Sequence, residues 1–535
     1  MTDKNNEQLI AKLISDSKSG KVSRRRFMEG TVAAGVTVAG ASSMWSSKVQ
    51  AATPKRGGTM RVGMHDGNTS DSLDPGTTES VYMIQLNHAS RSYLTEITET
   101  NGLGPDMADS WSASTDAKVW RFELAKGVTF HNGKTFTSAD AVASLNYHRG
   151  ETKSAAKALL TDVESIKTDG DNAIIITMKS GNADLPFLLG DYHLPMLPAK
   201  GDGIDWESGT GAGPYKIVSH NAGVSTELVR HDGYHRDGLA HFDGVNLTVL
   251  NDPNSRQSAL ITGEVDVISD VDLKTVGLLG RAPGIEIDNV ASGAHVTLPM
   301  FCDTEPFKSN HVRMALKLSI DRQAILDKIL YGYGSIGNDH PIGASVPYYA
   351  DLPQRGYDPD KAKWHLKEAG QENLSVSLSA TDSVMSGAVD MCTLYKEQAS
   401  EAGININVVR EPSDGYWSNV WLKKPFVFVQ WGARPTPDVM FSLAYKDDAA
   451  WNESHWQNAR FNELLRAAKS ELDQAKRTEM YKEMQMLCSD DGGTIVPFFR
   501  NRVSARRSNL KHGPNIAGNW EMDGARSYQR WWFDS

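Results

Sequence analysis

The chain has 535 residues, a length that suggests two to four domains or subdomains. Apolar residues make up 40% and charged residues 23% of the chain, which is typical of a globular protein and excludes a disordered or fibrous one. The net charge is −10 at pH 7, and no basic run occurs after the N-terminal segment, so neither nucleic acid nor an anionic membrane is an expected partner.

Residues 1–51 predict an export signal and not a part of the fold. Arg24 and Arg25 lie in the context SRRRFM, which resembles the signal of the twin-arginine export machinery. An uncharged stretch follows, and Val49-Gln50-Ala51 has small residues at the −3 and −1 positions of a signal-peptidase site. We therefore expect cleavage after Ala51 and a mature protein in the periplasm, without a lipid anchor. Because the signal carries eight basic and four acidic residues, the remaining chain has a net charge of −14.

The first half of the mature chain predicts alternating strands and helices. Apolar side chains alternate over residues 59–64, which is typical of a strand. Over residues 81–94 the apolar side chains have a weak helical spacing. Residues 110–131 alternate again and end in a hairpin-type turn. Thr137 to Asp140 then form a candidate capping box for a helix through Tyr147.

The second half predicts amphipathic helices between short strands. Apolar residues in 312–320 follow helical spacing, and Asp321 is a candidate N-cap for a helix over 322–331. Residues 461–472 carry an apolar stripe, after which Asp473 is a second candidate N-cap. Strands are expected between these helices, so the sequence predicts mixed α/β layers.

One stretch joins a predicted core strand to a candidate binding loop. Residues 426–429 read Phe-Val-Phe-Val, an unbroken apolar run that predicts a strand buried on both faces. The run breaks at Gly432, and Trp431 and Arg434 lie at its end. A rigid strand that delivers an aromatic ring and a fixed charge into a loop is a common basis for a ligand site. A core strand followed by an ordinary surface arginine is the alternative.

Several blocks in a fixed order identify a family. The chain reads GGTMRVG from residue 57, DSLDP from 71, DSWSASTDAKVWRFELAKGVTFHNGKTFTSADAVASL from 109, PFKSNHVRMALKLSIDRQAIL from 306 and YDPDKAKWHLKEAG from 357. These blocks closely resemble the solute-binding proteins of peptide/nickel-type ABC importers, solute-binding family 5. The resemblance spans essentially all of residues 55–500.

The resemblance implies an α/β fold of two lobes with a ligand cleft at a hinge. Lobe I is then expected over residues 52–293, with an extra subdomain at about 106–219. Lobe II is expected over 294–496, and residues 497–535 return to lobe I. Ligand would lie between the lobes and be enclosed as they close.

No residue pattern points to a cofactor, a metal site or catalysis. His231, His235 and His241 lie near acidic residues, but intervening glycines disfavour the helix that would align them as ligands. We find no nucleophile elbow, HExxH or kinase motif. The three cysteines, Cys302, Cys392 and Cys488, leave either one disulfide or three free thiols open. The expectation is a protein that is not an enzyme and needs no cofactor.

The candidate ligand site departs from the family pattern. In peptide-binding members an Asp three residues after a Trp pairs with the α-amino group of the ligand. Here the residue three positions after Trp431 is Arg434, which suits a carboxylate or other anionic group. Either the solute presents an anionic or neutral end, or Arg434 pairs with an internal acid such as Asp438. Tyr416, Trp417 and Trp421 could line the same pocket, and Tyr82 could close it from lobe I; each could also be a core residue.

We therefore predict the periplasmic substrate-binding component of an ABC transporter. It would be a monomer that captures a short peptide or peptide-like solute and delivers it to the permease. A non-peptide carboxylated solute, such as an amino-acid derivative or opine-like compound, is the first alternative, and an enzyme exported by the twin-arginine route is the second.

Overall fold

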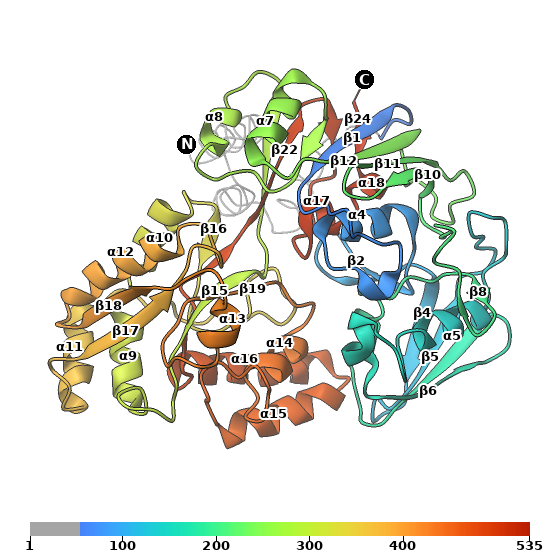
Figure 1. Cartoon of the computed structure of the whole chain (residues 1–535). Coiled ribbons are helices and arrows are strands. Elements are labelled where there is room, and N and C mark those ends of the chain that lie inside the picture. The colour runs from blue at the N-terminus through green and yellow to red at the C-terminus, as the bar shows by residue number, and fades with distance from the viewer. Residues whose placement is uncertain (1–53, 535) are drawn as a thin grey trace, which may run out of the picture.

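The computed structural model describes residues 54–534, and these form two lobes joined by two short crossings (Figure 1). We use lobe I for residues 54–291 and 502–534, and lobe II for residues 294–500. The predicted export signal, with Arg24, Arg25 and the cleavage position after Ala51, lies outside the described residues.

A seven-stranded mixed sheet forms the centre of lobe I. Its strand order is β10-β11-β12-β1-β13-β22-β14, and β1 pairs in parallel with both β12 and β13. The strands are β1 (Thr59–Met64), β10 (Tyr215–Asn221), β11 (Ser225–Arg230), β12 (Gly244–Val249), β13 (Val267–Ile268), β14 (Ile285–Val290) and β22 (Arg502–Arg507). Helices α4 (Val81–Ser90) and α7 (Pro253–Thr262) pack on this sheet. The predicted helix over 81–94 thus ends four residues early, at Ser90.

A separate antiparallel sheet forms a subdomain of lobe I with its own core. It contains β4 (Ala108–Ala113), β5 (Val119–Leu124), β6 (Val163–Thr168) and β7 (Ala173–Met178), covered by α5 (Ser138–Asn146). The predicted capping box is confirmed, because the backbone N–H of Thr137 donates to the Asp140 carboxylate at 3.0 Å.

Lobe II is built on a second sheet, which the predicted strand over 426–429 joins only in part. Its path is β16 (Gly334–Ile336), β21 (Phe498–Arg500), β15 (His295–Pro299) and β19 (Val429–Trp431), and β20 (Thr494–Ile495) also pairs with β15. Single bridges join Phe426 to Met300 and Val427 to Ser379, and so connect the parallel pair β17 (Ser375–Ala380) and β18 (Asn405–Arg410). Residues 426–429 are almost fully buried, as predicted, but the strand begins only at Val429, and Phe426 and Val427 form single bridges instead.

Helices surround this sheet, and several of them begin at a side-chain cap. They are α9 (Asn310–Leu318), α10 (Arg322–Ile329), α11 (Pro359–Glu368), α12 (Ala388–Ser400), α13 (Tyr416–Asn419), α14 (Pro437–Ala444), α15 (Ala459–Ser470) and α16 (Gln474–Asp490). Asp321 accepts a hydrogen bond from Ala324 N, and Asp473 accepts from Ala475 N and Lys476 N, so both predicted N-caps are confirmed.

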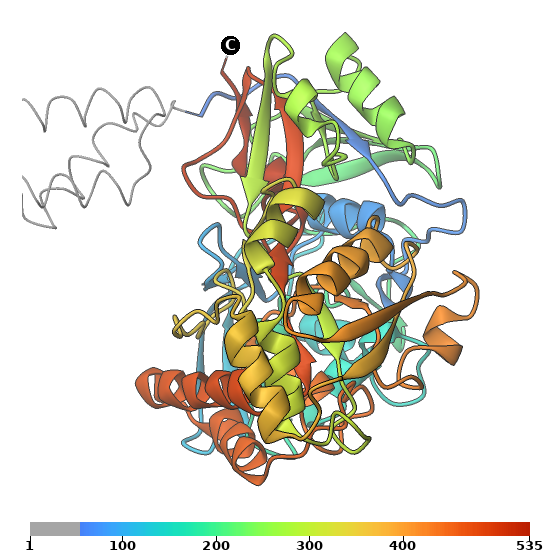
Figure 2. The same ribbon diagram turned by 90° about the vertical axis from the view of Figure 1, so that its left-hand side faces the viewer.

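The chain crosses between the lobes twice, and the two crossings are bonded to each other. The first lies between β14 and β15, and the second lies at Asn501, between β21 and β22. Ser292 Oγ donates to Arg500 O at 2.7 Å, and Arg500 N donates to Ala294 O at 2.7 Å. Figure 2 shows the lobe I sheet above lobe II with these segments between them. These two hydrogen bonds hold the crossings side by side.

Candidate functional site

Arg434 lies in the loop between β19 and α14, and the described part of the chain gives it no acidic partner. Its side chain is partly buried, and Nη1 donates to the carbonyl oxygens of Gly432 at 3.4 Å and Ala433 at 3.2 Å. Burial lowers the pKa of the guanidinium below its usual value, while Tyr192 and Asp191 act in the opposite direction. Within residues 54–534 no carboxylate lies within ion-pair distance of Arg434. The site thus holds a cation whose charge the described protein does not neutralise at contact distance.

The Arg434 loop meets lobe I across the cleft. A small cavity of about 20 Å³ is enclosed by Ala433, Arg434 and Pro435 from lobe II and by residues such as Asn101 and Asn519 from lobe I. The cavity has room for roughly one water molecule. Because both lobes line it, a group bound to Arg434 there would contact both.

Trp431 ends strand β19, and its indole is held by a buried carboxylate. Trp431 Nε1 donates to Glu453 Oε2 at 3.0 Å, and the guanidinium carbon of Arg434 lies 5.6 Å from the centre of the Trp431 ring. Glu453 also accepts hydrogen bonds from Trp421 Nε1 at 2.6 Å and Thr297 Oγ1 at 3.0 Å. Burial raises the pKa of Glu453 to about 7, although these three hydrogen bonds lower it. Sequence analysis missed Glu453, because an isolated acid in an irregular loop gives no pattern.

Three further tryptophans continue from Trp431 to the surface of lobe II. The ring centres are 5.9 Å apart for Trp431 and Trp451, 5.6 Å for Trp421 and Trp451, and 5.5 Å for Trp417 and Trp421. Trp417 is 51% exposed and Trp451 is 40% exposed. The predicted residue Trp417 therefore presents an open aromatic surface, at the far end of the row from Arg434.

Two predicted aromatic ligand contacts are core residues instead. The hydroxyl of Tyr416 donates to Ser379 O at 3.1 Å and to Phe428 O at 2.9 Å, and its ring is buried in lobe II. Tyr82 is fully buried in lobe I, where its hydroxyl bonds to Thr226 Oγ1 at 2.8 Å. In both cases the buried hydroxyl is satisfied by partners within one lobe, so the expectation that these rings line the cleft is wrong for this structure.

Asp438 does not pair with Arg434. It lies in the first turn of α14 and is buried, and its Oδ1 has no hydrogen-bond partner among the described residues. Burial and the nearby Asp184 raise the pKa of Asp438, while Lys469 and Arg477 lower it. Asp438 thus belongs to a contact between α14–α16 and the subdomain of lobe I, away from the guanidinium it was proposed to neutralise.

A larger cavity of about 650 Å³ opens between the lobes beside the crossings. Its wall includes His65 and Asp270 from lobe I, Tyr331 and Met385 from lobe II, and Arg500 from the second crossing. This volume is in the range of small-molecule sites, so the cleft can hold a solute of drug or short-peptide size.

Near this cavity a strained turn presents Glu521. Met522, Asp523, Gly524 and Ala525 have φ between 51° and 65°, so the chain makes a left-handed turn with mostly non-glycine residues. Strain of this kind is frequent at functional sites. The buried Glu521 carboxylate lies 3.7 Å from His65 Nδ1 and 3.6 Å from Arg502 Nη1, and burial raises its pKa. No sequence signal marked this turn.

Comparison with known proteins decides the family. The sequence model of the bacterial extracellular solute-binding proteins, family 5, matches residues 102–453, more than half of the chain. The chain belongs to this family. The expected family is therefore confirmed, and so is its implication that the protein is a solute-binding protein.

Relatives of this solute-binding protein cover nearly its whole length. The glutathione-binding protein GsiB of Pectobacterium atrosepticum is 23% identical over 501 residues, which covers 90% of this chain and 94% of GsiB. The periplasmic binding protein DppA of Helicobacter pylori, solved with the peptide STSA, has a TM-score of 0.70 at 21% identity and covers 90% and 99% of the two chains. AgaA of A. tumefaciens R10, solved with agropinic acid, has a TM-score of 0.70 at 22% identity and covers 89% and 99%. These likenesses confirm the two-lobed α/β fold.

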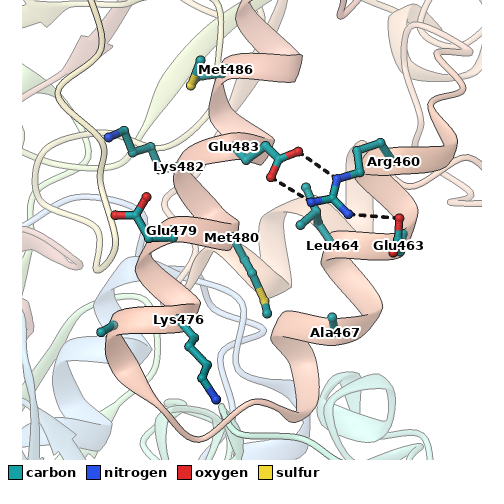
Figure 3. Close-up of a pocket in the computed structure, with 11 residues that line it drawn as sticks. Arg460, Glu463, Leu464, Ala467, Lys476, Glu479, Met480, Lys482, Glu483 and Met486 are labelled. Carbon is teal, nitrogen blue, oxygen red and sulfur yellow. Dashed lines mark hydrogen bonds and ion pairs between the residues drawn. The ribbon is translucent and has the colours of Figure 1, made fainter.

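A second concave surface of this family 5 protein lies away from the cleft. Figure 3 shows the groove between α15 and α16, where Arg460 pairs with Glu463 and Glu483. The residues that line the groove all come from these two helices. A solute there would not contact both lobes, so we place the candidate site at the cleft.

Other expectations concern metals, cysteines and membranes. Among residues 54–534 no three His, Cys, Asp or Glu side chains are grouped as metal ligands. His235 instead bonds to Asp106 at 3.1 Å, and the ring of His231 packs edge-on against His131.

Cys302, Cys392 and Cys488 are free thiols. Of the helices in the described part of the chain, none has the length and apolar character to cross a membrane.

Proposed function

We propose that this protein captures a small carboxylated solute or short peptide between its lobes and delivers it to an ABC permease. The observation that carries the proposal is the guanidinium of Arg434, which has no carboxylate partner within residues 54–534 and lies where the two lobes meet. A guanidinium presents a planar set of donors that matches a carboxylate, frequently through two hydrogen bonds. Trp431 would support the bound group from the side.

The names of the relatives agree with this range of solutes. They include a glutathione-binding protein, an oligopeptide-binding protein, and solved proteins that hold a peptide or agropinic acid. One relative is described as the periplasmic-binding protein of a probable peptide ABC transporter. Because Arg434 stands where an acid is expected for a peptide's α-amino group, the proposal favours recognition of a carboxylate at this end of the site.

A binding experiment with the mature protein tests the proposal. A thermal-shift screen would compare short peptides with non-peptide carboxylates, and calorimetry would give the affinity of the best hit. We expect Arg434→Ala to weaken that hit by about tenfold to a hundredfold, because hydrogen bonds to a charged group contribute about 1.5–3 kcal/mol. The affinity of Arg434→Lys should lie between those of the wild type and Arg434→Ala, since lysine keeps the charge but loses the planar set of donors.

The matched control is Arg410→Ala, which removes an exposed arginine that pairs with Asp382 at the surface of lobe II. It should leave affinity unchanged. Full affinity in Arg434→Ala would reject Arg434 as the anchor, and the absence of any hit among carboxylates and peptides would reject the proposed solute class.

We also propose export through the twin-arginine machinery, which rests on Arg24 and Arg25 alone. Replacing both residues with lysine should retain the precursor in the cytoplasm, because this machinery reads the arginine pair itself. Cell fractionation measures the outcome, and normal periplasmic accumulation of the variant would reject this route.

A further inference from the structure

Glu453 is a buried acid for which residues 54–534 supply no cationic partner. It is 4% exposed, and within the described residues no lysine, arginine or histidine lies within ion-pair distance of it. Burying a carboxylic acid that lacks a charged partner costs free energy unless its oxygens are hydrogen-bonded. An apolar residue would fill this position at lower cost, so the carboxyl group must do something that an apolar side chain cannot.

The hydrogen bonds of Glu453 connect three separate segments around the Arg434 loop. Oε1 receives Trp421 Nε1–H, from the turn before the buried strand. Oε2 receives Trp431 Nε1–H, from the end of β19, and the hydroxyl of Thr297, from β15. Each oxygen thus holds one indole, and the distances of 2.6 Å and 3.0 Å leave little freedom for either ring.

The orientation of Trp431 matters because Arg434 lies beside it. The Arg434 guanidinium carbon is 5.6 Å from the Trp431 ring centre, a distance at which the ring quadrupole attracts a cation. Within residues 54–534, Arg434 donates hydrogen bonds only to the carbonyls of Gly432 and Ala433, from its own loop. The ring of Trp431 therefore directs the guanidinium from the end of β19, and Glu453 fixes that ring.

We propose that Glu453 is a positioning residue for the solute site, which orients Trp431 and thereby holds Arg434 ready for a carboxylate. The inference rests on the proposed function, because it assigns a role within the same site. It adds a residue that has no predicted contact with solute. Trp421 donates to the other oxygen of the same carboxyl group.

Hydrogen-bond chemistry makes the role of both oxygens testable. An indole N–H only donates, so each indole needs an acceptor. Glu453→Gln replaces one oxygen with an NH₂ group, which then faces an indole donor and cannot accept from it. Thr297 cannot accept the hydrogen bond of the displaced indole in place of the lost oxygen, because its hydroxyl contacts only the Oε2 position. The glutamine variant must therefore release either Trp421 or Trp431.

Removing the competing donor should restore the site. In Glu453→Gln combined with Trp421→Phe, the amide NH₂ no longer opposes an indole, and the amide oxygen is free for Trp431 and Thr297. Glu453→Gln combined with Trp431→Phe balances the hydrogen bonds equally well but loses the indole beside Arg434. The two double variants therefore separate positioning of Trp431 from general stabilisation of the loop.

The experiment measures affinity by calorimetry, with the carboxylate hit of the wild-type screen as probe, and near-ultraviolet circular dichroism of the tryptophans. We expect Glu453→Gln to weaken binding about tenfold and to reduce the tryptophan signal. Trp421→Phe alone should change affinity by less than about threefold, and the Trp421→Phe/Glu453→Gln variant should bind like Trp421→Phe. The Trp431→Phe/Glu453→Gln variant should stay weak.

Two results would overturn the inference. One is wild-type affinity in Glu453→Gln with an altered tryptophan signal, because the rings would then have moved without effect on the solute. The other is equal rescue by both double variants, which would make Glu453 a stabilising residue only. Neither result touches the proposed function, which is judged by whether the wild-type protein binds carboxylates and whether Arg434→Ala loses them.

Discussion

At the scale of single residues, the protonation of Glu453 links the site to pH. Burial raises its pKa from an ordinary value of 4.5 to about 7. The folded protein therefore holds this proton more tightly than the unfolded chain does. The group contributes most to stability below the unfolded pKa, and the contribution is lost as pH rises through the folded pKa. Thr297 can accept a hydrogen bond from the protonated acid, because its hydroxyl can reverse direction.

This gives a prediction for the variant that cannot titrate. The melting temperature of wild type minus that of Glu453→Gln should be larger at about pH 5 than at about pH 8. The full change corresponds to roughly 3 kcal/mol, since one pKa unit equals about 1.4 kcal/mol. Asp438 also has a raised pKa, but it titrates in both proteins, so its effect cancels in the difference. A difference that is constant over this range would show that Glu453 stays ionised.

Residue identity alone predicted only part of the candidate site. Arg434 and Trp431 could be singled out because they follow an apolar run at a loop, where position carries information. Tyr82 and Tyr416 were chosen as aromatics near the expected cleft, and both are core residues whose hydroxyls bond within one lobe. Glu453 was not found, because its role depends on Trp421 and Thr297, which are distant in the sequence.

At the scale of elements, helix α16 begins at a cap whose effect can be measured in isolation. Asp473 is exposed and accepts hydrogen bonds from Ala475 N and Lys476 N. Asp473→Ala should lower the free energy of unfolding by about 1 kcal/mol, the usual effect of losing an N-cap. Denaturant unfolding followed by circular dichroism would measure this. Asp473→Asn should retain most of the stability, and equal loss in both variants would contradict a capping role.

Elements with local signals were predictable, and those shaped by distant contacts were not. The burial of residues 426–429 and the caps at Asp321 and Asp473 follow from neighbouring residues alone. The left-handed turn at 522–525 does not, because Met522, Asp523 and Ala525 favour right-handed conformations. It is held by contacts outside the turn, in which Asp523 accepts hydrogen bonds from Ala517 N at 2.8 Å and Arg530 Nη1 at 3.0 Å.

At the scale of the whole molecule, lobe II contacts lobe I at a second place, remote from the crossings. Figure 1 shows α15 and α16 extending toward the subdomain of lobe I. Arg477 on α16 forms a buried ion pair with Asp184 of the subdomain at 2.5 Å, and Ala183 N donates to Lys469 O at 2.7 Å. Arg477 Nη1 also donates to Tyr348 Oη at 3.0 Å. The two-lobed fold could be predicted from family blocks, but this contact joins segments almost 300 residues apart.

This second contact should control how far the lobes separate. Opening would expose Asp184 and Arg477 to water, and Arg477→Met would leave Asp184 as an unpaired buried carboxylate whenever the lobes close. Breaking a buried pair in this way costs about 3–5 kcal/mol, so the variant should favour the open form. We expect a larger radius of gyration by small-angle X-ray scattering without solute and an affinity lowered by more than about tenfold.

Asp184→Asn in the same protein should recover part of the affinity, because the amide carries no charge to bury. Arg460→Met, which breaks an exposed pair within the α15–α16 hairpin, should match wild type in both measurements. If Arg477→Met has the wild-type radius of gyration and affinity, the contact does not set the separation of the lobes.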